Sequence, residues 1–180
     1  MIKIKHLKPG KTTIHFHIVD SDATYNHKIS RDLNRDPFYQ IHSYNNLPFF
    51  LEQYQKRQKN KEEIDLVIIG MQLLKRNDNT EETIQQIKRI NKSAEIIVLT
   101  EEVDSDHIPE TLEQGVYSII KKNDNAVFRI ENAAKGIKSM KVFLTKKRAV
   151  RISLIIFLSF SVIVLLAFLL FKARILSHFL

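Results

Sequence analysis

Polar residues follow three of the apolar runs in this chain, and their side chains are the ones that could do chemistry together. Asp20 follows IHFHIV, Thr100 ends IIVLT and Lys122 follows SIIK, whereas a fourth run, LVIIG, ends in Gly70. A carboxylate, a hydroxyl and an ammonium group could hold a metal ion, hold a small anion or pair with one another. Because Mg²⁺ needs near-octahedral oxygen coordination, Asp20 alone would be a poor site for it.

The alternation of β-rich apolar runs with amphipathic stretches predicts the elements that position these side chains. We expect strands over residues 14–20, 39–43, 66–70, 96–100 and 118–121. We expect helices over 23–34 and 47–59, a helix that begins at Asn79, one that ends at Gln114 and one that begins at Asn125. Ser21 and Asp22 are the two candidates for the N-cap of the first helix. Strands that are apolar throughout are typical of a parallel sheet covered by helices on both faces, so the fold class is α/β, doubly wound. The functional crevice of such a sheet lies at the carboxyl ends of its strands.

A run of twenty residues near the C-terminus, Ile152–Phe171, contains no charged side chain. At about 1.5 Å per residue a helix of this length spans about 30 Å, which predicts a transmembrane helix. Basic residues flank the run unevenly, with six shortly before it and two after it: Lys138, Lys141, Lys146, Lys147, Arg148 and Arg151, then Lys172 and Arg174. This bias favours a cytoplasmic N-terminal domain and a non-cytoplasmic tail. A buried core helix is the alternative, and it is rare at this length and apolarity.

Charge and cysteine content narrow the class of protein. The net charge is +8, yet residues 1–140 hold 21 basic and 20 acidic side chains. The excess therefore lies beside the apolar run, which argues against nucleic-acid binding. The chain has no cysteine, so disulfides and cysteine-based zinc sites are excluded. A zinc site of His15, His17 and His42 is a weaker hypothesis, because His15 and His17 alternate with apolar residues as in an ordinary strand.

These features divide the chain into five parts. They are an extension (1–13), an α/β domain (14–140), a basic segment (141–151), the transmembrane helix (152–171) and a short tail (172–180). The last helix of the domain either continues into the membrane or breaks near Gly136–Ser139, and we favour continuity. We expect no cofactor, no metal and no enzymatic activity.

The strand ends resemble those of the receiver domain of bacterial two-component response regulators, the CheY-like family. The resemblance covers about Ile14 to Lys138 and rests on IVDSD, DLVIIG, VLT and the G-x₆-K spacing from Gly115 to Lys122. It implies a flavodoxin-like sheet of order 2-1-3-4-5 in a bacterial protein. Together with the apolar run Ile152–Phe171, it predicts a single-pass protein of the bacterial cytoplasmic membrane. In that family an aspartate at the end of strand three accepts a phosphoryl group, and acids after strand one help to hold Mg²⁺. A lysine helps the metal ion to neutralise the charge that develops on the transferred phosphoryl group, and a threonine or serine responds to the bound phosphoryl group.

The chain departs from that pattern where the chemistry takes place. Gly70 stands at the acceptor position, and Asp20 followed by Ser21 replaces the acid pair, while Thr100 and Lys122 are retained. Glycine cannot be phosphorylated, so the resemblance implies a degenerate site, a pseudo-receiver. We expect Lys122 to pair with Asp20, because an unpaired acid in a crevice is costly.

The predicted function is therefore non-enzymatic: a membrane-anchored pseudo-receiver that acts by protein–protein contact in signalling or in a membrane complex. A second copy of the chain is one candidate partner. The family's usual partner face maps onto Ile108, Leu112, Ile119 and Phe128. Pro109 predicts that the helix there starts late. Two alternatives stay open: a regulator that accepts a phosphoryl group on Asp20 or Asp22, and a module that binds a small anion or nucleotide near Lys122.

Overall fold

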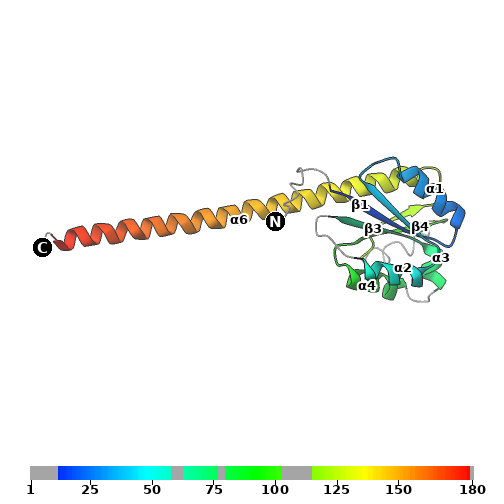
Figure 1. Cartoon of the computed structure of the whole chain (residues 1–180), viewed down its shortest axis with the longest axis horizontal. Helices are drawn as coiled ribbons and strands as arrows, with labels where there is room; N and C mark the ends of the chain where they lie inside the picture. The colour runs from blue at the N-terminus through cyan, green and yellow to red at the C-terminus, as the bar shows by residue number, and fades with distance from the viewer. Residues whose placement is uncertain (1–11, 58–62, 77–79, 103–114, 179–180) are drawn as a thin grey trace, which may run out of the picture. The chain divides into compact units, whose positions relative to one another are not determined.

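The computed structural model describes residues 12–57, 63–76, 80–102 and 115–178. The chain divides into two compact units, Met1–Lys138 and Ser139–Leu180. The first unit contains a sheet with helices on both of its faces, as Figure 1 shows.

The sheet has five strands, each parallel to its neighbours, in the order β2-β1-β3-β4-β5. Their bounds are β1 Ile14–Val19, β2 Tyr39–Tyr44, β3 Ile64–Gly70, β4 Glu95–Thr100 and β5 Ser118–Lys121. The predicted doubly wound parallel sheet and its strand order are confirmed. Every residue of β1 and β3 is buried, which explains the continuous apolar run Leu66–Ile69 of β3. In β1 the alternating residues His15 and His17 are buried as well.

Two core clusters lie on opposite faces of the sheet. On one face α1 (Ala23–Leu33) and the first turns of α6 (Ala126–His178) pack through Ile29, Leu33 and Ile130. On the other face α2 (Leu47–Lys56), α3 (Met71–Arg76) and α4 (Thr80–Ile90) pack through Phe50, Leu74 and Ile84. The sequence did not predict α3, because six residues are too few to show a helical period.

Helix starts follow the expected capping chemistry. Asp22, one of the two predicted caps, accepts hydrogen bonds from the backbone N–H groups of Thr24 and Tyr25 at the start of α1. Asn46 accepts one from Phe49 at the start of α2. The Asp22 carboxylate is therefore already hydrogen-bonded to the start of α1.

The second unit consists of the later part of α6. The Ser159 and Ser161 hydroxyls donate to the carbonyls of Ile155 and Phe157, 2.9 and 3.0 Å away. Within the residues whose side chains are described, which end at Ile163, no helix is long and apolar enough to cross a membrane. The helix expected around Pro109 lies outside the described residues.

Candidate functional site

Asp20 and Gly70 meet at the carboxyl edge of the sheet. The preceding residues, Val19 and Ile69, are paired in the parallel register of β1 and β3. Asp20 is 1% exposed, and a Cβ atom added to Gly70 would lie 2.7 Å from its Cγ. The Asp20 carboxylate thus fills the volume that any side chain at position 70 would need. The close approach explains why this position carries glycine.

Lys122 balances the buried carboxylate. Its Nζ lies 2.7 Å from Asp20 Oδ2, and its side chain is 9% exposed. The expected internal ion pair is therefore present. Asp20 Oδ1 accepts the backbone N–H of Asp22 at 3.0 Å, so both carboxylate oxygens have partners. Lys122 also lies over the Tyr25 ring, with Nζ 5.0 Å from its centroid. Burial and then the charge of Asp20 raise the pKa of Tyr25 to about 12.

Thr100 is also engaged inside the protein. Its hydroxyl donates to the carbonyl of Glu102, with 2.5 Å between the oxygens. The Lys122 backbone N–H donates to the Thr100 carbonyl at 2.7 Å, and Gln72 Nε2 donates to Glu101 Oε1 at 2.9 Å. These bonds connect the ends of β3, β4 and β5.

The sequence did not single out Asn26, which fixes the first loop. Asn26 is buried on α1, and its Nδ2 donates to the carbonyls of Asp20 at 2.9 Å and Tyr44 at 3.0 Å. These bonds hold the end of β1 against the end of β2. The sequence did contain a signal for this role. Asn26 carries a side-chain amide one helical turn after the cap Asp22, on the face of the helix that packs against the sheet.

The three predicted histidine neighbours do come together, around a buried ion pair. His15 Nδ1 lies 3.4 Å from His42 Nε2, and the His17 and His42 rings stack with centroids 5.0 Å apart. Arg57 donates to Asp65 and lies 3.1 Å from His17 Nε2. The positive charge of the Arg57 guanidinium group would repel a metal ion bound among these histidines. Within the described ranges no three His, Cys, Asp or Glu side chains are placed to hold a metal ion.

Hydrogen bonds set the charges of this cluster. Although burial favours the protonated acid, hydrogen bonds from His17 and Arg57 and the positive charge of Arg57 hold the pKa of Asp65 below its usual value. Burial lowers the pKa of His17 from its ordinary 6.5 to about 4. Burial also lowers the pKa values of His15 and His42. The cluster is thus stable with a charged Asp65–Arg57 pair and neutral imidazoles.

The depressed pKa of His17 predicts an acid-sensitive fold. As the pH falls, the unfolded chain binds a proton at about 6.5 and the folded protein only near 4, so stability is lost between these values. Between pH 6.5 and 5 His17 alone should lower the free energy of unfolding by about 2 kcal/mol. Asp65 stays ionised over this range. Urea titrations of the wild type and His17→Gln should differ by that amount in their pH dependence. Equal dependence in both proteins would contradict this assignment.

Of the four residues predicted as a partner face, the structure describes two, Ile119 and Phe128. Ile119 packs against the core cluster under α2, α3 and α4. Phe128 lies on α6, which covers the opposite face of the sheet, and its side chain is 63% exposed. Ile108 and Leu112 lie outside the described residues. Ser21 is half-buried in the turn between Asp20 and α1.

No family model and no curated protein matches the chain. Solved structures do match it. The signal receiver domain of an HD domain-containing protein from Pseudomonas fluorescens Pf-5 is 20% identical over 72% of this chain and 97% of that chain, with a TM-score of 0.58. A CheY-like response regulator receiver domain protein from Methanospirillum hungatei JF-1 is 16% identical over 71% and 96%, with a TM-score of 0.57.

A response regulator from Burkholderia pseudomallei, solved with a phosphorylated aspartic acid, a calcium ion and citrate, is 17% identical. The match covers 70% of this chain and 72% of that chain, with a TM-score of 0.54. At such identities the likeness concerns the fold. Together with the strand order β2-β1-β3-β4-β5, it shows that the chain has the CheY-like fold of a response-regulator receiver domain.

Proposed function

We propose that this protein is a phosphorylation-independent receiver-like module that acts by protein–protein contact. The observation that carries the proposal is the closed site at the carboxyl edge. Gly70 offers no acceptor atom, and the Asp20 carboxylate occupies the space beside it. The Lys122 ammonium group, which could neutralise a phosphoryl group, is paired with Asp20.

The alternative acceptors and the anion site have less support. Asp20 is buried and paired on both oxygens, and Asp22 caps α1. The Burkholderia pseudomallei protein holds its phosphoryl group on an aspartic acid, whereas Gly70 ends β3 here. An anion near Lys122 would first have to displace the Asp20 carboxylate, which is paired with this lysine.

The proposal includes a membrane anchor at residues 152–171. Its support is the twenty-residue run without a charge and the absence of acidic residues after Glu131. The basic residues before the run place the receiver-like domain in the cytoplasm in this proposal. Extraction of the full chain from membranes by detergent, but not by alkaline carbonate, tests the anchor. Release by carbonate would reject it.

Incubation of the full chain with acetyl phosphate and Mg²⁺ tests the closed site. We expect no hydroxylamine-sensitive acyl-phosphate label, because Gly70 has no carboxylate and the Asp20 carboxylate is buried and paired with Lys122. A receiver domain with an intact acceptor aspartate, treated in parallel, controls for donor activity. Stoichiometric label that is lost on substitution of Asp20 or Asp22 would overturn the proposed function.

A further inference from the structure

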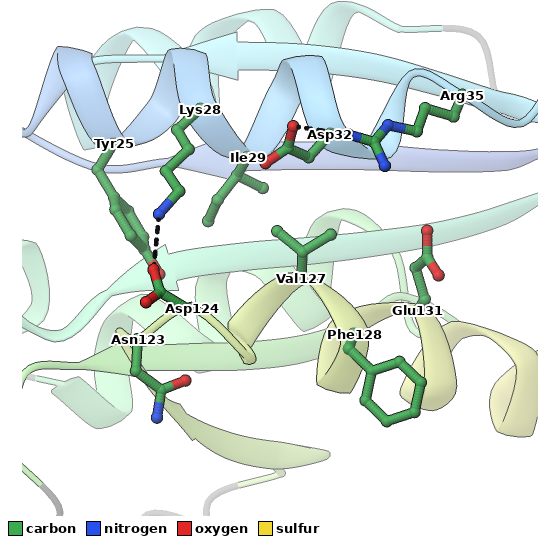
Figure 2. A pocket seen from close by; sticks show the side chains of 10 residues that line it. All are labelled: Tyr25, Lys28, Ile29, Asp32, Arg35, Asn123, Asp124, Val127, Phe128 and Glu131. Carbon is green, nitrogen blue, oxygen red and sulfur yellow. Dashed lines mark hydrogen bonds and ion pairs between the residues drawn. The ribbon is translucent and has the colours of Figure 1, made fainter.

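Phe128 lines a groove between α1 and the first turns of α6, although its ring is largely in solvent. The groove has a volume of about 290 Å³ and is lined by residues of both helices and of the loop before α6. Figure 2 shows Ile29 and Val127 facing each other across it, with charged side chains along both rims. An apolar cavity of roughly 150 Å³ is enough to bind benzene, so the groove has room for a phenyl ring.

We propose that this groove is the docking face for a second copy of this chain, related by a two-fold axis. An exposed aromatic side chain beside an apolar floor is typical of the centre of a protein interface. Here the projecting ring and the hollow that fits it belong to the same patch. A patch that carries both parts is self-complementary, so each copy inserts Phe128 into the groove of the other. The contact then closes on itself as a dimer.

The charges of the groove favour a second copy over a partner of one sign. Asp124 lies at one end, with its side chain 99% exposed, and Arg35 lies at the other end, 79% exposed. Arg35 Nη2 lies 3.3 Å from Asp32 Oδ1, and a surface ion pair of this kind contributes little. A two-fold axis through the middle of the groove brings Arg35 of each copy to Asp124 of the other. Lys28, 3.1 Å from Asp124, is itself half-exposed, so this surface ion pair contributes little and can rearrange on docking.

The second copy is the partner in the protein–protein contact proposed above, and to that extent the dimer rests on the proposed function. The groove lies on the α1 and α6 face, and it does not include the Asp20–Lys122 pair. Phosphoryl labelling therefore tests the closed site, and association tests the groove, so either can fail alone.

Single cysteines test the arrangement, because the chain contains none of its own. Asn132→Cys places a thiol on the exposed surface of α6, one turn after Phe128, and Gln86→Cys places a matched thiol on exposed α4. In full-length protein in detergent, we expect oxidation to give a disulfide dimer with N132C and not with Q86C. Equal dimer yields from both variants would overturn the proposal.

Three substitutions in the N132C protein test the contacts themselves. Phe128→Glu should weaken self-association measured by sedimentation about tenfold or more, with the unfolding midpoint unchanged because the ring is exposed. Arg35→Asp and Asp124→Arg should each reduce the dimer yield, and the double reversal should restore it. Dimers that persist in F128E, or a double reversal that fails to recover, would reject the two-fold docking.

Discussion

Lys122→Ala should cost the fold about 3–5 kcal/mol, because it leaves the buried Asp20 carboxylate without its cation. The attraction within a buried ion pair offsets the cost of removing both charges from water. When one partner is removed, the desolvation cost of the remaining charge is no longer offset. Asp20→Ala should be similarly damaging, since Lys122 is itself mostly buried. Neither change should alter phosphoryl labelling.

Urea unfolding of the full chain in detergent, followed by circular dichroism, measures this effect. Lys28→Ala is the matched control, because it removes a lysine from an exposed ion pair with Asp124 and should cost at most about 1 kcal/mol. The double variant Asp20→Asn with Lys122→Met removes both charges and should be more stable than Lys122→Ala alone. If Lys122→Ala and Lys28→Ala destabilise equally, the buried pair does not hold this edge.

Gly70→Ala should destabilise the protein by about 1–3 kcal/mol, the usual cost of forcing a methyl group into a packed interior. The new Cβ would meet Asp20, whose carboxylate is fixed by Lys122 and by the Asp22 backbone. For the same reason Gly70→Asp should not create a working phosphoryl acceptor. An aspartate at position 70 would still lack room for its side chain, because the Asp20 carboxylate occupies that volume.

A double-mutant cycle with Asp20→Ala tests the steric cause. Removing the carboxylate opens the space, so Gly70→Ala should cost less in that background, and the coupling should approach the whole single-variant effect. Gly136→Ala is the control, since that residue is in a helix and its Cβ would lie 3.3 Å from the Tyr117 hydroxyl. It should be within about 1 kcal/mol of neutral. Additive effects of Gly70→Ala and Asp20→Ala would contradict the proposed clash.

Local pattern was sufficient to predict most of the fold. Continuous apolar runs such as those of β3 and β4 predicted the parallel strands, and Asp22 was one of two residues predicted to cap α1. A strand pattern and a helix cap each involve only residues that are close together in the sequence, so both can be recognised without the tertiary structure. The helix α3 was missed because six residues carry no clear period.

The sequence by itself determined that β3 ends in a residue with no acceptor atom, because Gly70 has no side chain in any conformation. Only the tertiary structure decided what fills the space beside it. Asp20 and Lys122 are 102 positions apart in the sequence, and their pairing depends on strands β1 and β5 ending at the same edge. The Arg57, Asp65 and His17 cluster was missed for the same reason: contacts between separate elements have no period in the sequence.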